Sequence, residues 1–186
     1  MDVKLRNKKV SIAILLFFII VIIIISTLIS EKNNKYQVLS DNEIENFVKD
    51  QKIVKVAVEN VKNTKKPHAI VLYTDNDKIG NYILTKKDKK IEKIKSLEIK
   101  RNKNKKFETL GVQTGSPFIS IVINDGDLLK NSNDIEVTFD NKHAVTRKIK
   151  QNKKYYIISS HRLLNQEKIN TKFIIFDKQN KPLVIH

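Results

Sequence analysis

Two acidic turns are the stretches of this sequence that come closest to a metal-binding motif. In the first, Asp75 and Asp77 have the i, i+2 spacing of a calcium-binding loop, and Gly80 stands at its sixth position. The fifth and twelfth positions are Ile79 and Lys86, where such a loop needs an oxygen ligand and a bidentate glutamate. Aspartate, asparagine and glycine are also the residues that a hairpin turn favours. We therefore expect a turn here rather than a cation site.

The remaining residues with chemical potential form no complete site either. The second acidic turn, Asn124–Asp127, places two carboxylates around a glycine with no third ligand nearby, and a turn is again expected. The four histidines show none of the spacings typical of zinc sites, and the chain contains no cysteine. Ser159 and Ser160 precede His161, but neighbouring residues of a strand point to opposite faces, and a catalytic triad needs further partners. The sequence thus predicts no catalytic residue, no metal site and no cofactor.

Positive charge is the most pronounced feature of the composition. The formal net charge is +16 and the isoelectric point is near 9.8. Such a charge attracts anionic wall polymers or lipid headgroups. The candidate surface for this binding consists of nine basic residues: Lys86, Lys87, Lys89, Lys90, Lys100, Arg101, Lys103, Lys105 and Lys106. The alternative is AT-rich coding bias, because the chain is also rich in asparagine and isoleucine.

Specific nucleic-acid recognition is not expected from this charge. The positive residues are almost all lysines, whereas phosphate and base readout prefers the planar fork of arginine. Tyr155 and Tyr156 follow two lysines and offer rings on which a base could stack. In a strand only one of the two tyrosines would face solvent, so cross-strand packing is the preferred interpretation.

The long apolar segment at residues 10–29 predicts a transmembrane helix. It contains no charge and no proline, and its length of about 20 residues matches the hydrocarbon core of a bilayer. A signal peptide is expected to be shorter and to end in a small-x-small cleavage site, which is missing after Ser30. A cleaved signal and a buried core helix remain as alternatives. The lipid bilayer is the partner expected for this segment.

The flanking charges predict the orientation of that helix. Four basic residues within residues 1–9 stand against a single acidic one, so the positive-inside rule predicts a cytoplasmic tail. Residues 30–40 would form a tether. The rest would form an extracellular domain of a single-pass protein of the cell membrane.

The part of the chain after the tether predicts a mainly β, α+β domain. A helix is expected from residue 41 to about residue 52, because Ile44, Phe47 and Val48 fall on one face and either Ser40 or Asp41 can cap its start. Strands then follow in a small α+β subdomain at 41–104. The basic loop Lys100–Lys106 is the best internal boundary. Regularly spaced short strands at 105–186 predict a β-sandwich or a barrel.

Two stretches carry a resemblance to known proteins: "IEVTFDNKHAVTRKIKQNKKYYII" at 135–158 and "KFIIFDKQNKPLV" at 172–184. Both resemble the strand-turn-strand pattern of immunoglobulin-like modules, and this resemblance implies an immunoglobulin-like β-sandwich at 105–186. In its layout the chain is similar to uncharacterised single-span proteins of low-GC Gram-positive bacteria that carry an exported, lysine-rich β domain. This resemblance implies no activity and no site residues.

The function expected from the sequence is that of a non-enzymatic, membrane-anchored interaction module of the cell envelope. Such a module would contact another envelope protein through a strand face or an exposed sheet edge. One alternative is an electrostatic binder of anionic wall polymers or lipid headgroups, whose binding would fall steeply with salt. The other alternative is an enzyme of wall metabolism.

Overall fold

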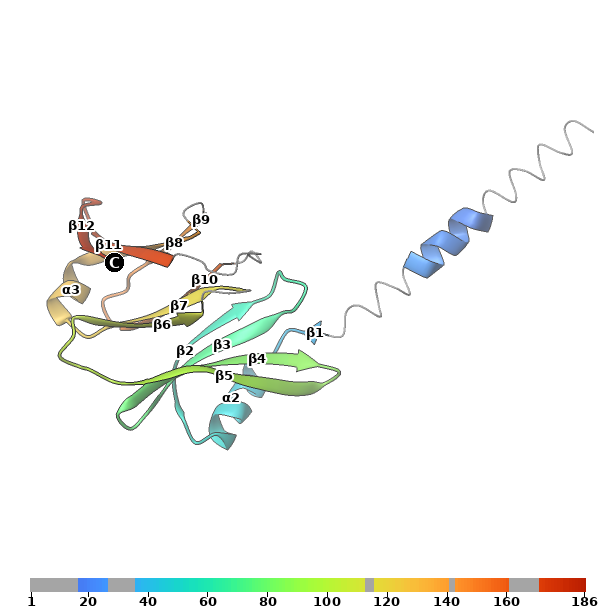
Figure 1. Cartoon of the computed structure of the whole chain (residues 1–186), viewed down its shortest axis with the longest axis horizontal. Helices are drawn as coiled ribbons and strands as arrows, with labels where there is room; N and C mark the ends of the chain where they lie inside the picture. The colour runs from blue at the N-terminus through green and yellow to red at the C-terminus, as the bar shows by residue number, and fades with distance from the viewer. Residues whose placement is uncertain (1–16, 27–35, 113–115, 141–142, 161–170) are drawn as a thin grey trace, which may run out of the picture. The chain divides into compact units, whose positions relative to one another are not determined.

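The computed structural model describes residues 17–26, 36–112, 116–140, 143–160 and 171–186 of the chain, whose course is drawn in Figure 1. The chain divides into two compact units, Met1–Lys35 and Tyr36–His186. The second unit contains nearly all of the described secondary structure and is mainly β, with three antiparallel sheets and two short helices.

The first unit corrects the prediction of a transmembrane helix. Its described helix covers residues 17–26 instead of the expected 10–29. No helix within the described ranges is long and apolar enough to cross a membrane. This finding overturns the predicted anchor, and with it the single-pass topology, the cytoplasmic N-terminus and the extracellular placement of the domain. Residues 1–16 and 27–35 lie outside the described residues.

Sheet 1 is an antiparallel meander at one side of the second unit. Its strands run in the order β2–β3–β4–β5, and the short β1 pairs with the end of β4. The bounds are β1 (Tyr36–Gln37), β2 (Val54–Val61), β3 (His68–Asp75), β4 (Lys78–Lys87) and β5 (Lys90–Lys100). The stretch Asp75–Gly80 contains the β3–β4 turn, as expected, and Asn76 in this turn has a φ of 51°. This left-handed conformation is one that asparagine tolerates.

Helix α2 (Asp41–Asp50) covers the outer face of sheet 1. Ser40 and Glu43 form a capping box, in which each side chain accepts a hydrogen bond from the other residue's backbone N–H. Lys86 of β4 lies 2.7 Å from the Glu43 carboxylate, and this contact together with the Ser40 N–H lowers the pKa of Glu43 to about 2. Ile44, Phe47 and Val48 are buried against β3 and β4, as their spacing predicts.

Sheet 2 is the central layer of the second unit. Within the described ranges it has three strands, in the order β10–β7–β6: β6 (Phe107–Val112), β7 (Phe118–Ile123) and β10 (Tyr155–Ser159). All six residues of β7 are buried. Phe118 and Val122 pack against sheet 1, whereas Ile119, Ile121 and Ile123 pack against sheet 3. A strand covered on both faces must be apolar on both, which explains the uninterrupted apolar run in this segment.

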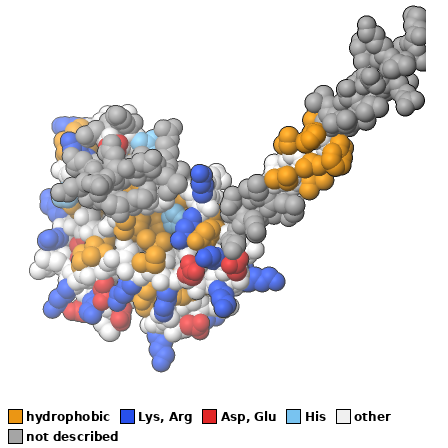
Figure 2. Space-filling view, turned by 45° about the vertical axis from the view of Figure 1, so that its right-hand side comes forward, with side chains coloured by type: hydrophobic (Ala, Val, Ile, Leu, Met, Phe, Trp, Pro, Cys, Tyr) orange, Lys and Arg blue, Asp and Glu red, His pale blue; other side chains and the backbone are white. Residues whose placement is uncertain are grey.

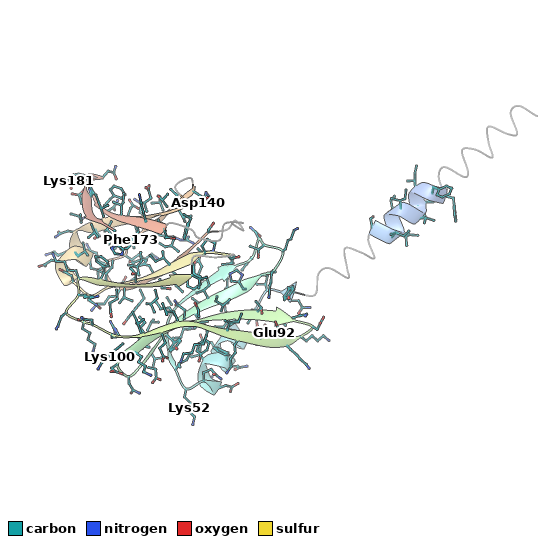
Figure 3. The ribbon with its side chains drawn as sticks, in the orientation of Figure 1. Lys52, Glu92, Lys100, Asp140, Phe173 and Lys181 are labelled. Atoms are coloured by element: carbon teal, nitrogen blue, oxygen red, sulfur yellow. The ribbon has the colours of Figure 1, made fainter. Side chains whose placement is uncertain are left out.

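Sheet 3 closes the other side of sheet 2. Its strands run in the order β12–β11–β8–β9: β8 (Ser132–Phe139), β9 (His143–Lys148), β11 (Thr171–Asp177) and β12 (Pro182–Ile185). Phe139 and Phe173 are among the largest side chains buried between sheets 2 and 3, and Phe173 is labelled in Figure 3. Helix α3 (Gly126–Asn131) follows β7, and the Asp125 side chain caps it by accepting the N–H of Leu128 at 2.9 Å.

The strand order of sheets 2 and 3 follows an immunoglobulin-like scheme. In that scheme strands A, B and E form one sheet and strands C, F and G belong to the other. Strands β6, β7 and β10 correspond to strands A, B and E. Strands β8, β11 and β12 correspond to strands C, F and G, and β9 lies beside β8. The fold class expected from the sequence is therefore corrected at its N-terminal part, where no membrane-spanning helix is described, while the chain beyond residue 35 is mainly β.

A buried polar pair between sheets 1 and 2 provides a test of this layered core. Ser120 donates a hydrogen bond of 3.1 Å to the side-chain carbonyl of Asn81, and both residues are fully buried. Ser120→Ala leaves that carbonyl without its donor, so we expect a loss of about 1–3 kcal/mol in the free energy of unfolding. The double variant Asn81→Leu, Ser120→Ala, in which neither polar group remains, should recover much of the loss. Urea denaturation measures both, and an unchanged midpoint for Ser120→Ala would contradict this role.

Candidate functional site

The nine basic residues expected to form one anionic-binding surface lie at the two ends of β5. Lys86, Lys87, Lys89 and Lys90 surround the β4–β5 turn, and the other five belong to the end of β5 and the β5–β6 loop. Strand β5 has eleven residues, so the two groups are about 30 Å apart. Glu92 and Lys100, both labelled in Figure 3, indicate this separation. On the face drawn in Figure 2, basic side chains are scattered among acidic ones and form no continuous patch.

Two of the nine residues are engaged inside the structure. Lys86 forms the ion pair with Glu43 on α2. Arg101 has only 12% of its side chain exposed and pairs with Glu108, which is 3% exposed. In addition, the Lys87 ammonium lies over the ring of Tyr36, 5.9 Å from its centroid. The Lys100 ammonium is 3.6 Å from the Asp77 carboxylate, and the side chains of Lys100 and Asp77 are both largely exposed. These partners were not identified from the sequence, and they lie on other strands, on α2 or across a loop.

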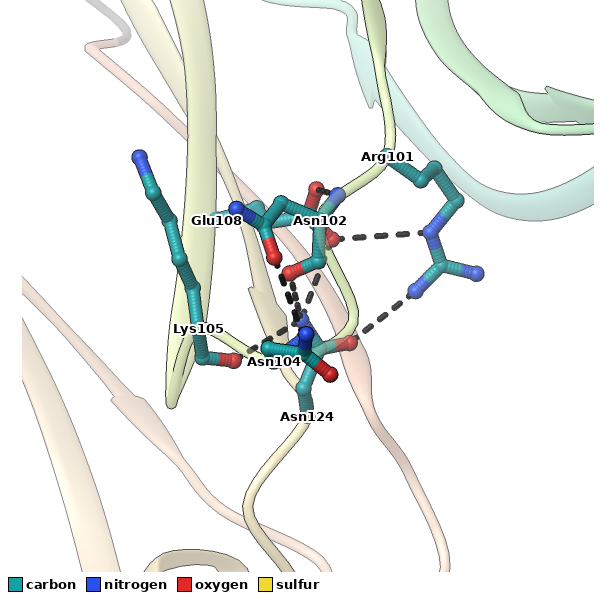
Figure 4. A network of polar contacts seen from close by, with 6 residues as sticks. All are labelled: Arg101, Asn102, Asn104, Lys105, Glu108 and Asn124. Carbon is teal, nitrogen blue, oxygen red and sulfur yellow. Dashed lines mark hydrogen bonds and ion pairs between the residues drawn. The ribbon is translucent and has the colours of Figure 1, made fainter.

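Figure 4 shows the polar network that fixes the β5–β6 loop against sheet 2. The Glu108 carboxylate accepts hydrogen bonds from the Asn102 backbone N–H at 2.6 Å and from the Asn124 side chain at 3.1 Å. The Arg101 guanidinium donates to Glu108 at 3.5 Å and to the Asn124 side-chain carbonyl at 3.0 Å. Asn124 also donates to the backbone carbonyl of Lys105 at 3.1 Å. The loop is thus held at both of its ends.

The same network sets the ionisation of Glu108. Burial alone would raise the pKa of this carboxyl, but the Asn102 N–H, the Asn124 amide and the Arg101 charge together outweigh it, and the pKa lies below its ordinary value of 4.5. Glu108 is therefore a carboxylate at neutral pH, and it neutralises Arg101. The lysines of the loop contribute the uncompensated positive charge.

A groove runs along β6, the strand at one edge of sheet 2. A cavity of about 460 Å³ lies at the start of β6, between the end of β5 and His186; it is lined by Ile99, Lys100, Asn102, Lys105, Lys106, Phe107, Glu108, Thr109 and His186. A second cavity of about 210 Å³ lies further along the same strand; it is lined by Leu97, Thr109, Leu110, Gly111, Phe118, Ile119, Thr171 and His186. The two cavities share Thr109 and His186. They form one groove, which we call the β6 groove.

Strand β6 presents unpaired backbone groups to this groove. The Asn124 N–H bonds the Lys106 carbonyl, whereas the Ile123 N–H is directed to Lys154, on the side of β10. Because backbone groups alternate in direction along an antiparallel ladder, Phe107, which is opposite Ile123, points its N–H and C=O away from β7. The same holds for Thr109 and Gly111. No partner strand for this edge is found among the described residues.

The walls of the β6 groove differ along its length. At the start of β6 the groove is basic, and the rings of Phe107 and His186 lie edge to face at 5.6 Å. Further along it is lined by apolar and small uncharged residues, including Leu97 of β5, which is 41% exposed. Gly111 is required here, since a Cβ at this position would lie 2.3 Å from the Phe118 carbonyl oxygen. A glycine within a strand often marks such a close approach of two backbones.

The other residues singled out in the sequence lie away from the groove or take structural roles. Asn124 belongs to the Arg101 network and Asp125 caps α3. Tyr156 is buried and its hydroxyl accepts the Lys150 N–H at 2.9 Å, and Tyr155 packs on the opposite side of sheet 2, so neither ring is offered to a base. His161 lies outside the described residues. Within the described ranges, no group of three or more acidic, histidine or cysteine side chains is placed to hold a metal ion.

Comparisons with known protein families, with characterised proteins and with solved structures found no match to this chain. The β6 groove must therefore be interpreted from its own geometry and charge.

The buried Arg101–Glu108 pair predicts an acid-dependent contribution to stability. Because the folded-state pKa of Glu108 is lowered, its stabilising effect is present above the ordinary value of 4.5 and is lost as the pH falls below it. Glu108→Gln removes this dependence, and it also leaves Arg101 without its counter-charge, at a cost of about 3 kcal/mol at neutral pH.

The measurement is urea denaturation of the wild type and of Glu108→Gln from neutral pH to below 4.5. The difference in the free energy of unfolding between the wild type and Glu108→Gln should become smaller as the pH falls. Glu43 and Glu98, whose pKa values are both lowered to about 2, also reduce stability as the pH falls. Since both residues are present in the wild type and in Glu108→Gln, their effect cancels when the two free energies of unfolding are subtracted. A difference that stays constant with pH would show that Glu108 is not held ionised by this network.

Proposed function

We propose that residues 36–186 form a non-enzymatic binding module, which takes up an extended segment of a partner protein as an additional strand beside β6. The observation that carries this proposal is the recessed free edge of β6, with the backbone groups of Phe107, Thr109 and Gly111 directed into the β6 groove. Added strands gain affinity from main-chain hydrogen bonds and specificity from pockets for alternate side chains. The two cavities along β6 offer such pockets.

The other sheet edges are less suited to receiving a strand. Strand β5 carries lysines at four positions, Lys90, Lys93, Lys95 and Lys100, and lysine is a common means of protecting an exposed edge. Strand β12 has four residues and begins with Pro182. Strand β2 faces β10, and its Glu59 forms an ion pair with Arg147 of β9 at 2.5 Å. Strand β9 is the last strand of sheet 3 among the described residues, and every second residue in its burial pattern is exposed.

The electrostatic alternative has weaker support. A surface for long anionic polymers should be continuous, whereas the nine basic residues fall into two distant groups. Lys86 and Arg101 are already paired with carboxylates. The lysines at the start of β6 remain available, and they line the β6 groove itself.

The proposal is tested by removing one outward N–H from β6. Thr109→Pro deletes a group that faces the groove and leaves the ladder to β7 intact, since Thr109 makes no bond to that strand. The matched control is Thr146→Pro, because Thr146 has the same outward orientation on the free edge of β9. The probe is a peptide selected with the full-length protein from a display library of random decapeptides.

Binding of that peptide, measured by fluorescence anisotropy, should fall at least about tenfold in Thr109→Pro, through the lost hydrogen bond and the altered strand edge, and stay within about twofold in Thr146→Pro. N-methylation along the peptide should weaken binding at every second residue, because only alternate N–H groups face β6. Failure of the library to yield any binder, or equal effects of the two proline variants, would refute the proposal.

A further inference from the structure

The charge of the β6 groove is confined to one end. The cavity at the start of β6 is lined by Lys100, Lys105 and Lys106, and Glu108, the one Asp or Glu side chain among its described lining residues, is already paired with Arg101. The cavity further along the strand is lined by no acidic or basic side chain other than His186, which the two cavities share. A segment that fills the groove therefore meets positive charge at one of its ends and an apolar surface along the rest.

The lysines at the charged end are available for a ligand. Lys103, Lys105 and Lys106 are exposed, and no carboxylate lies within ion-pair distance of them among the described residues. Lys100 has a partner in Asp77 at 3.6 Å, but the two side chains are 82% and 61% exposed, so solvent screens this pair strongly. The Arg101 network holds the backbone of the loop in place, which positions these lysines beside the first residue of β6.

The direction of the bound segment follows from the same asymmetry. Every strand pair described in this protein is antiparallel, and antiparallel pairing is slightly more stable per residue than parallel pairing. A segment antiparallel to β6 brings its C-terminal end to Lys105 and Lys106. There a free α-carboxylate adds negative charge, whereas a parallel segment would bring an α-ammonium to the same lysines.

On these grounds, and resting on the proposed function, we infer that the ligand of the β6 groove is the acidic C-terminal tail of a partner protein. The tail lies antiparallel to β6, with its last carboxylates at Lys100, Lys105 and Lys106. Its preceding residues alternate, so that every second side chain enters the apolar part of the groove beside Leu97 and Gly111. Phe107 and Ile99, which line the charged cavity beside the lysines, favour an apolar residue just before the acidic end.

The charge test compares two pairs of adjacent exposed lysines in the full-length protein. Lys105→Gln, Lys106→Gln neutralises the charged end of the groove, and Lys89→Gln, Lys90→Gln removes the same charge at the far end of β5. The probe is the library-selected peptide with a free C-terminus. The first variant should weaken its binding about tenfold at low ionic strength and reduce the salt dependence, while the second should change binding by less than about twofold. Equal effects of the two variants would overturn the inference.

The peptide itself supplies the second arm of the test. The inference predicts that selected sequences carry Asp or Glu within their last three residues, and that C-terminal amidation or exchange of these residues for Asn and Gln weakens binding. A spin label at the peptide N-terminus should broaden the amide resonance of Gly111 rather than those of Lys105 and Phe107. Broadening at Lys105 instead would demonstrate a parallel segment and refute the inferred direction.

The outcomes separate this inference from the proposed function. A peptide whose binding is weakened by Thr109→Pro supports strand addition. If that peptide has no acidic end, or binds the Lys105→Gln, Lys106→Gln variant as well as the wild type, the acidic-tail inference is refuted while strand addition is retained. A peptide that depends on the lysines but tolerates Thr109→Pro refutes both, since its binding is then purely electrostatic.

Discussion

The structure of residues 36–186 depends on one constraint, that β7 is buried on both of its faces. Alternate side chains of this strand enter two different cores: Phe118 and Val122 face sheet 1, while Ile119, Ile121 and Ile123 face sheet 3. A shift of register by one residue would exchange the two sets. Ser120, bonded to the buried Asn81 of sheet 1, places a polar group on one face only, and this distinguishes the two cores.

The candidate site is a consequence of the same layering. Among the described residues, sheet 2 has three strands and lies between sheets of five and four. Its edge strand β6 is recessed, because residues of β5 on one side and Thr171 and His186 on the other line the cavities along it. A recessed edge is shielded from pairing with another folded sheet, which is the usual hazard of free edges. It remains open to a single extended segment, and the cavities along β6 measure about 460 and 210 Å³. Gly111 keeps the strand close to β7 by omitting a side chain.

Several basic residues of this protein act in local contacts, although the net charge of the chain is +16. Lys86 pairs with Glu43 and helps to hold α2 on sheet 1. Arg101 pairs with Glu108 and helps to hold the β5–β6 loop on sheet 2. What remains near the β6 groove is a small group of exposed lysines at one end. A long anionic polymer requires a continuous basic surface, whereas the end of a peptide chain requires only a small basic cluster. The positions of the basic residues are therefore more informative about the ligand than the net charge.

The sequence by itself determined the local features of the fold. Capping residues and apolar periodicity located α2, and short apolar runs between turn residues located most strands, because these signals act between near neighbours. The sequence misled at residues 10–29, where composition predicted a spanning helix and the described helix covers only 17–26. Only the tertiary structure decided that nine basic residues separate into two groups, that Arg101 meets Glu108 and Asn124, and that β6 lies at a recessed edge. These facts follow from pairing between distant strands, which no local pattern of residues encodes.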